Sequence, residues 1–477
     1  MTQRTSTGIP ETAKSNQRLA ILLAMAMFVL VVDTSLMNVS ISAVVRDIGT
    51  TVSGVQSAIA LEALVSAAFI LIGSKVGDLI GRKLAYVLGL LGYAVGALAM
   101  AFAQSLTAII VFWAVVGGLG ASLLLPAKQS LIHGNFEGAA QKKAYALVGA
   151  SAAIAAAVGP LLGGFVTTYL SWRVGFLFEV AVIAVVLSGI RLVHDVPYTG
   201  SRHIDLVGAL LSVLAMGGIV LGILIWQEGG ESVFGVLAIG AVAMVLLVYW
   251  LRRRKRQGKP TLLDPDLFRS KVFESGVSGQ MLQQIALGGT ILTIGLVLLV
   301  PIVLRADSGW WLAIPLIIAG GGLGLLVSQL NNYTLSPISD ERVSEAAGVN
   351  SAAGSFGLSF GLAFAGAIML ATLSLSFTSL ANASTVLSPG EQQQVAHALE
   401  TDAQILSNTQ LKQQLASHPE KVQNEIIRIN TDARHLALQI ALLIPILAGG
   451  LGLLNSFRMM RLPDPVPSET AEGMALG

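Results

Sequence analysis

The chain has 477 residues, of which 54% are hydrophobic and only 12% are charged, with a net charge of +2. Soluble domains carry roughly a quarter charged residues, so this composition and a mean hydropathy of +0.74 exclude a soluble protein and indicate many membrane crossings. The small net charge gives no indication of a nucleic-acid partner, and the absence of cysteine excludes disulfides, thiolate catalysis and cysteine metal sites.

Apolar stretches of about 20 residues, the length needed to cross a bilayer, recur along the whole chain. The first follows a polar, Ser- and Thr-rich segment and is too long for a signal-peptide core, so we interpret it as a retained span. We expect about twelve membrane-spanning helices, at 19–45, 54–76, 84–103, 106–131, 144–169, 174–193, 205–226, 233–251, 273–304, 310–330, 346–378 and 434–456.

Basic residues cluster after alternate spans. They are Arg82, Lys83, Lys142, Lys143, Arg202, the five residues at 252–256, Arg342, Arg458 and Arg461. Cytoplasmic loops carry an excess of lysine and arginine, so this pattern predicts that both termini are cytoplasmic. We expect the cluster at 252–256 to anchor the topology and to contact anionic lipid.

The polar, Gln-rich stretch 379–433 interrupts the series and falls outside the membrane by the same count. Residues 388–391 read as a capping box with proline at the first helical position, and 417–420 repeat that signature. We therefore expect two or three amphipathic helices that form a small external cap.

Ionisable residues inside spans are costly and are therefore functional candidates. Asp33, Glu62 and Glu179 each fall within a predicted span, and Asn38 lies one turn after Asp33. A carboxylate in a partly dry cavity can exchange protons and also attract a cationic substrate, and competition between the two would produce an antiporter. The alternative is that these are structural carboxylates satisfied by neighbouring helices.

The glycine-rich, charged stretch 73–83 joins the second and third spans. It is expected to be a short cytoplasmic loop that turns the chain sharply, with Asp78 capping or pairing with a helix end. The alternative is a simple positively charged hairpin. Its candidate residues are Gly77, Asp78, Gly81, Arg82 and Lys83.

Gly159, Pro160, Gly163 and Gly164 lie within the fifth span. Proline removes a helix hydrogen bond and glycines leave a groove, so this segment is expected to bend and to pack closely against another helix. His397 with Glu400 or Asp402 is interpreted as surface polarity, because a full set of metal ligands is lacking. We expect no metal site and no catalytic residue.

Three motifs resemble those of the major facilitator superfamily, most closely its bacterial drug:proton antiporters of the fourteen-helix branch. Residues 73–83 are similar to the motif between helices two and three. Residues 159–164 are similar to the antiporter motif of helix five, the most specific of the three. Residues 32–39 are similar to the Asp-x-Thr-x-x-x-Asn-Val signature of helix one. The resemblance covers about 19–260 and resumes near 262.

The sequence also departs from the family pattern. Ser74 replaces a leading glycine, and Leu79 replaces an arginine. Ala114 stands where the helix-four motif carries an arginine associated with proton coupling. Glu62 and Glu179 stand where relatives usually have tyrosine and asparagine, so proton coupling has either moved to Glu62 or been lost.

A second departure lies in the second half of the chain. Residues 287–292 resemble the middle of the family's helix nine, and 294–299 resemble the middle of helix eleven, with almost nothing between them. This implies an internal deletion of about two helices and a cytoplasmic loop. Loss of an even number of helices preserves the downstream topology, in agreement with the charge pattern.

The resemblance implies an all-α polytopic fold with two helical bundles around a central cavity. The expected division is a cytoplasmic tail at 1–18, a six-helix bundle at 19–193, a linker helix pair at 194–251, a basic loop at 252–271, a shortened bundle at 272–378, the external loop at 379–433, the last span at 434–457 and a cytoplasmic tail at 458–477. A bacterial inner (plasma) membrane is the implied location.

The expected function is proton-coupled efflux of small amphipathic or cationic compounds by alternating access, with no cofactor and the proton gradient as the energy source. Asp33 and Glu62 would bind proton or substrate, and Asp78 and Arg82 would latch the inner gate. Alternatives are a non-transporting deletion form that acts as a membrane partner or regulator, and a metabolite uniporter or symporter. A nucleotide-driven pump is not expected, because the sequence has no Gly-x-x-x-x-Gly-Lys-Ser/Thr loop, and no clustered side chains indicate an enzyme.

Overall fold

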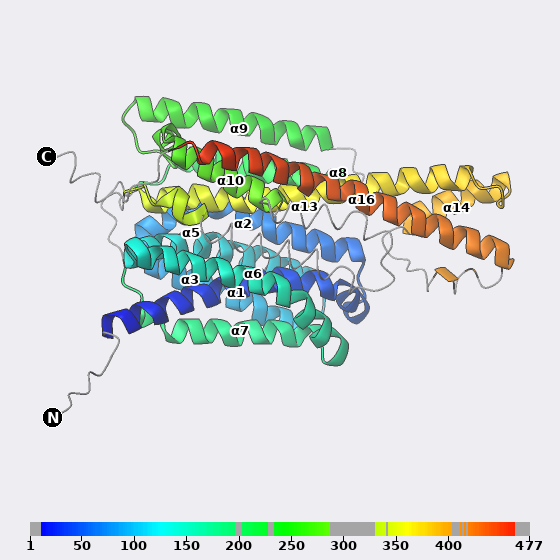
Figure 1. Ribbon diagram of the computed structural model, residues 1–477, viewed down its shortest axis with the longest axis horizontal. Helices are drawn as coiled ribbons and strands as arrows, with labels where there is room; N and C mark the ends of the chain where they lie inside the picture. Colours follow the sequence, from blue (N-terminus) through cyan, green and yellow to red (C-terminus); the bar gives the residue numbers. More distant parts are fainter. Residues whose placement is uncertain are drawn as a thin grey trace.

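The computed structural model describes residues 11–195, 203–227, 233–286, 330–339, 342–402, 411–412, 415 and 418–462. Within these ranges all regular secondary structure is helical. The predicted all-α polytopic membrane fold is therefore confirmed. Figure 1 shows the long helices lying side by side, with the start of α1 and the end of α16 at the same end of the bundle.

The first half of the chain forms a compact set of helices. They are α1 (Glu11–Ile48), α2 (Val52–Ile80), α3 (Arg82–Phe102), α4 (Leu106–Ala108), the π-helix η1 (Ile109–Gly117), α5 (Gly118–Asn135), α6 (Gly138–Tyr169), α7 (Trp172–Ser188) and the short η2 (Ile190–Leu192). The segments α4, η1 and α5 together form the fourth predicted span.

The second half continues with longer helices. They are α8 (Leu206–Gln227), α9 (Val233–Arg256), the 3₁₀ turn η3 (Pro265–Arg269), α10 (Lys271–Ala286), α13 (Val343–Asn382), α14 (Pro389–Asp402) and α16 (Glu420–Met459). In the described part of the chain, eight helices are long and apolar enough to cross a membrane, or nine when the two segments of the bent α6 count as one span. The fused stretch at 287–299 and most of the predicted span at 310–330 lie outside the described residues.

The predicted loop at 73–83 is almost entirely helical, which corrects our expectation. Helix α2 continues to Ile80 and α3 begins at Arg82, so the turn is made by Gly81 alone. Gly81 has φ +100° and ψ 136°, a conformation that only glycine adopts readily. The charged residues on either side of Gly81 remain helical, and Asp78 and Arg82 pair with each other across the turn.

The last membrane helix is also longer than expected. Helix α16 begins at Glu420, not near 434, and α13 extends to Asn382. The two helices and α14 share a hydrophobic cluster that includes Phe377, Leu387 and Ile429. The predicted external cap is therefore built largely on extensions of membrane helices. Ser417, part of the second predicted capping box, lies outside the described residues.

The first predicted capping box, at 388–391, is formed as expected. The Ser388 N–H donates to Glu391 Oε2 at 2.8 Å, and the Glu391 N–H donates back to Ser388 Oγ at 3.4 Å. The same hydroxyl and N–H of Ser388 lower the pKa of the Glu391 carboxyl. Two N-terminal donors of α14 are satisfied in this way.

The basic cluster at 252–256 belongs to the last turns of α9 and not to a loop. The predicted basic loop is thereby reduced to the residues between Arg256 and Lys271, part of which forms η3. Arginine and lysine favour helical structure, and cations at a helix C-terminus interact well with the helix dipole, which accounts for the continuation.

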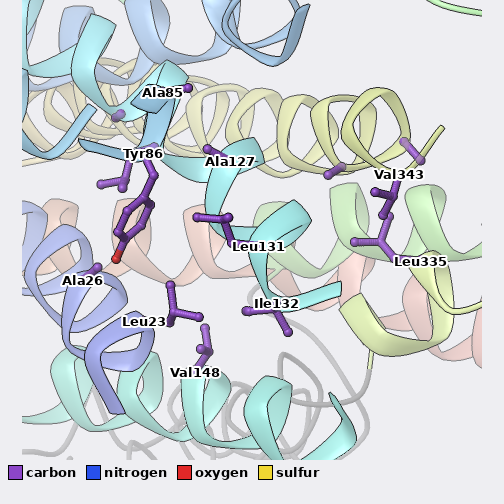
Figure 2. Packing of buried hydrophobic residues seen from close by; sticks show 14 of the residues in the cluster. Leu23, Ala26, Ala85, Tyr86, Ala127, Leu131, Ile132, Val148, Leu335 and Val343 are labelled. Atoms are coloured by element: carbon purple, nitrogen blue, oxygen red, sulfur yellow. The ribbon is translucent and has the colours of Figure 1, made fainter. Parts of the chain in front are cut away.

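One hydrophobic cluster joins the two halves of the chain. Figure 2 shows buried side chains of α1, α3, α5 and α6 packing near residues of the second half. The labelled members are Leu23, Ala26, Ala85, Tyr86, Ala127, Leu131, Ile132, Val148, Leu335 and Val343. The end of the molecule at which α13 begins is therefore closed by packing between the halves.

The single-residue turn gives a test of the fold. Gly81→Ala is expected to lower the free energy of unfolding by about 1–3 kcal/mol, since the sparsely populated backbone conformation is retained at that cost. The added Cβ would also lie 2.7 Å from Asp195 Oδ2. Unfolding in mild detergent measures the effect. Gly235→Ala is the matched control, because a Cβ there meets nothing within 4 Å and lies in a helix. Equal stability of the two variants would contradict the conclusion that Gly81 makes the turn in a conformation that favours glycine.

Candidate functional site

The centre of the candidate site is Asp33, near the middle of α1. Its side chain is 1% exposed although it lies within a membrane span. The Tyr93 hydroxyl of α3 donates a hydrogen bond to Asp33 Oδ2, and the Trp113 Nε1–H of η1 lies 3.0 Å from Oδ2 and 3.1 Å from Oδ1. Two neighbouring helices thus supply donors that water would otherwise provide.

The segment that supplies Trp113 is an unusual helix. η1 is a nine-residue π-helix within the fourth span. Such segments are rare and occur often at functional sites. Ala114, where the family pattern has an arginine, is fully buried in η1. An indole N–H, and not a guanidinium, therefore faces the Asp33 carboxylate from this helix.

Two further carboxyl groups lie close to Asp33. Glu179 of α7 is 0% exposed, and neither of its carboxyl oxygens has a hydrogen-bond partner at good geometry. Glu179 and Glu62 both interact electrostatically with Asp33, and all three carboxyls act on the Tyr93 hydroxyl. We call Asp33, Glu62 and Glu179 the carboxyl cluster. The structure thus brings together three of the four predicted binding residues.

Charge repulsion determines which protonation states of this cluster are stable. Within the described residues, the charge that acts on Glu62 and on Glu179 is that of Asp33. Three negative charges in a poorly hydrated site repel strongly, so the cluster is stable only when protons or a bound cation reduce its charge. Such a cluster can hold a proton or a cation.

Asn38, the fourth predicted binding residue, does not join the cluster. Its side chain is exposed, and its Nδ2 donates to the Thr34 carbonyl at 2.7 Å on the same helix. Thr34 and Ser35 likewise bond to carbonyls one turn earlier. The polar residues that follow Asp33 are thus satisfied within α1.

The glycines of the fifth predicted span pack against α1. A Cβ at Gly159 would lie 2.6 Å from Ser35 Cβ, and one at Gly163 would lie 3.3 Å from Leu36 Cα. Gly164 faces open space. Helix α6 bends by 40° at a break just before this segment, because Pro160 lacks the N–H that would bond to the carbonyl of Ala156. The bend brings the helix close to the turn of α1 that follows Asp33.

The predicted gating residues lie at the end of the molecule where the halves meet. Asp78 and Arg82 form a buried pair, with Nε 3.8 Å from Oδ1, and Asp78 also interacts with Ser344 near the start of α13. Gly77 is buried and faces Ala85, where a Cβ would make an ordinary contact at 3.4 Å. The predicted pairing of Asp78 with a neighbouring helix end is consistent with this geometry.

Direct hydrogen bonds between α2 and α13 close this end. Ser74 Oγ donates to the Ser344 carbonyl at 2.7 Å, and Ser344 Oγ lies 3.4 Å from the Ser74 carbonyl. Further along α13, Asn350 Nδ2 donates to Asn331 Oδ1 at 2.7 Å and to Gln129 Oε1 of α5 at 3.3 Å, so only the second bond joins the two halves. We call the Ser74–Ser344 contact with the Asp78–Arg82 pair the gate contact.

Lys83 has a different role from Arg82. Its backbone N–H donates to Asp195 Oδ1 at 3.0 Å, and its Nζ donates to the Val193 carbonyl at 2.8 Å. Gly81 has no side chain to cap α3, so Asp195 supplies the capping carboxylate from a distant part of the chain. Lys83 therefore fixes the chain after η2 to the start of α3.

Acidic residues on the loop after α9 connect it to α13. Asp264 accepts a hydrogen bond from Lys255 Nζ at 2.7 Å and forms an ion pair with Arg342, whose Nη2 lies 3.1 Å from Oδ2. The backbone N–H of Asp264 donates to Glu345 Oε1. Burial alone would raise the pKa of Asp264, but Lys255, Arg342 and the Asp266 N–H together lower it. The linker helices are thereby tied to the end of the second half that carries the gate contact.

Sequence reasoning missed three residues of this region. Tyr93 and Trp113 are aromatic residues in apolar helices, and nothing in the sequence separates them from ordinary packing residues. Lys128, by contrast, is a charged residue inside a span and was detectable by the rule that identified Asp33. It is 3% exposed, and its Nζ contacts Met27 Sδ at 2.8 Å. The side chains of His397, Glu400 and Asp402 lie outside the described residues.

Comparisons with known proteins show which proteins the chain is similar to. The family model described as Major Facilitator Superfamily matches residues 23–204. The chain is 24% identical over 434 residues to the protein named Probable actinorhodin transporter of Streptomyces coelicolor, covering 77% of this chain and 75% of that protein. It is 28% identical over 289 residues to the Multidrug efflux pump LfrA of Mycolicibacterium smegmatis, covering 60% of this chain and 57% of that protein.

A solved structure has the same fold. The proton:xylose symporter XylE matches with a TM-score of 0.57 at 10% identity, covering 97% of this chain and 100% of that one. The chain therefore has the all-helical, multi-pass fold of that membrane protein. Residues 23–204 are similar to the major facilitator superfamily, and the relatives of the chain are named as transporters and efflux pumps, not as enzymes, in agreement with the prediction that it is not an enzyme.

The hydrogen bonds to Asp33 are testable one donor at a time. Tyr93→Phe and Trp113→Phe are each expected to reduce the free energy of unfolding by about 1.5–3 kcal/mol, because each removes a hydrogen bond to a buried charged group. Each loss is expected to shrink when Asp33→Asn is already present. The measurement is a double-mutant cycle in mild detergent. Tyr169→Phe is the control, since Tyr169 is 73% exposed. Additive losses would contradict the described contacts.

Proposed function

We propose that the protein is a secondary active transporter that exports small cationic or amphipathic compounds in exchange for protons. The carboxyl cluster carries this proposal, because it places the buried Asp33 and Glu179 and the half-buried Glu62 within one membrane-spanning bundle. Protons and a cation would compete for it, so release of one drives binding of the other. The proton gradient is the proposed energy source, and no cofactor is required.

Alternating access is the proposed mechanism. The gate contact joins the two halves at one end, and this end is proposed to face the cytoplasm because the basic end of α9 also lies there. Transport requires that the gate contact break while the halves close at the opposite end. Asp78 and Arg82 would stabilise the state closed at the gate, and the bend of α6 would set its packing on α1.

The substrate class is proposed from the site and its relatives together. An acidic cluster favours a cation, and the surrounding residues Leu36, Met37 and Phe176 are apolar. Such surroundings suit an amphipathic compound with a positive charge. Two matched relatives are named as a probable actinorhodin transporter and a multidrug efflux pump. A bacterial inner membrane is the proposed location.

Dye export from inverted membrane vesicles tests the proposal. Under an imposed proton gradient, the wild type is expected to move dye and Asp33→Asn is expected to fall to the level of empty vesicles, because the central proton site is lost. Asp432→Asn, on the exposed part of α16, is the control at matched expression. Export by Asp33→Asn at the wild-type rate would remove Asp33 from the mechanism. Absence of export by the inserted wild type would favour the non-transporting deletion form.

Cross-linking tests the gate contact. The natural chain has no cysteine, so Ser74→Cys/Ser344→Cys introduces a single pair without background. Oxidation is expected to join the pair, because the two residues bond reciprocally, and to stop export until a reductant is added. Each single cysteine variant serves as a control. Undiminished export by fully cross-linked protein would show that this end need not open during transport.

A further inference from the structure

The five basic residues at the end of α9 divide between two faces of the helix. Arg254 faces the bundle: its Nε donates to the Pro260 carbonyl at 2.8 Å and lies 3.7 Å from Asp205 Oδ2. Lys255 pairs with Asp264 at 2.7 Å and with Asp266 at 3.4 Å. The charges of these two residues are therefore compensated within the protein.

The other three residues lie on the outer side. Arg252, Arg253 and Arg256 are exposed, and they form no ion pair with any acidic residue in the described part of the chain. They line one end of an open groove of about 710 Å³ on α9. Three uncompensated guanidinium groups in one groove are complementary to an anion.

The rest of the groove is apolar. Val245, Val248 and Tyr249 line it toward the middle of α9, and Val245 and Tyr249 are 68% and 61% exposed. From Val245 to Arg256 the helix rises about 16 Å at about 1.5 Å per residue. That length is close to half of a hydrocarbon core of about 30 Å, the depth of one leaflet. The groove therefore has a cationic end at the membrane surface and an apolar body one leaflet deep.

We propose that this groove binds an anionic phospholipid. The phosphate pairs with Arg252, Arg253 and Arg256, and one acyl chain lies along Val245, Val248 and Tyr249. A neutral lipid would leave the three arginines without a counter-charge, and a free phosphate would leave the apolar residues without a partner. This site is separate from the carboxyl cluster and does not depend on the proposed transport reaction.

Native mass spectrometry of the full chain, exchanged into equal amounts of phosphatidylglycerol and phosphatidylcholine with the same acyl chains, tests the proposal. The wild type is expected to retain phosphatidylglycerol preferentially. Arg252→Gln, Arg253→Gln and Arg256→Gln are each expected to weaken retention about fivefold, the effect of removing one cation near a membrane surface. Substitution of all three by lysine is expected to keep most of the retention, because the charge is preserved.

Two controls separate a lipid site from general attraction. Arg18→Gln/Lys142→Gln/Lys143→Gln removes three exposed cations elsewhere and is expected to leave retention unchanged. Glycerol phosphate, which carries the anionic group without acyl chains, is expected not to displace the lipid. Equal loss in this triple variant, unchanged retention in the groove variants, or displacement by glycerol phosphate would each overturn the proposal.

Discussion

The interior of a membrane bundle offers no water to a buried carboxylate, so the protein itself must supply the donors. Around Asp33 that requirement fixes the arrangement of several helices. α3 provides the Tyr93 hydroxyl and η1 provides the Trp113 indole, while α7 places Glu179 beside them. Helix α6 packs on the next turn of α1 through glycine. The first half of the chain is thus organised around one acidic group.

The second half of the chain contacts the first half away from the carboxyl cluster. Its contacts with the first half include the hydrogen bonds between Ser74 and Ser344, the bond from Asn350 to Gln129 and the hydrophobic cluster of Figure 2. These contacts join the two halves, whereas the carboxyl cluster lies wholly within the first half. The binding chemistry and the contact that must break for access are therefore carried by separate residues, and each can change without disrupting the other.

Hydropathy was sufficient to predict most spans, because a length of about 20 apolar residues is imposed by the bilayer. The same cost argument found Asp33, Glu62 and Glu179. It could not find Tyr93 or Trp113, since an aromatic residue that donates to a carboxylate and one that only packs look the same in sequence. The helical form of 73–80 and the early start of α16 were missed because polar residues were interpreted as loops. A polar residue therefore does not mark the end of a helix.

Helices α13 and α16 each contain 40 residues. At about 1.5 Å per residue such a helix is about 60 Å long, roughly twice the hydrocarbon thickness. The cluster of Phe377, Leu387 and Ile429 clamps their far ends together with α14. If this pair of helices tilted within the membrane, a small rotation near the gate contact would produce a larger displacement of their far ends. Those far ends carry the cap and lie away from the end of the molecule where α1 begins (Figure 1).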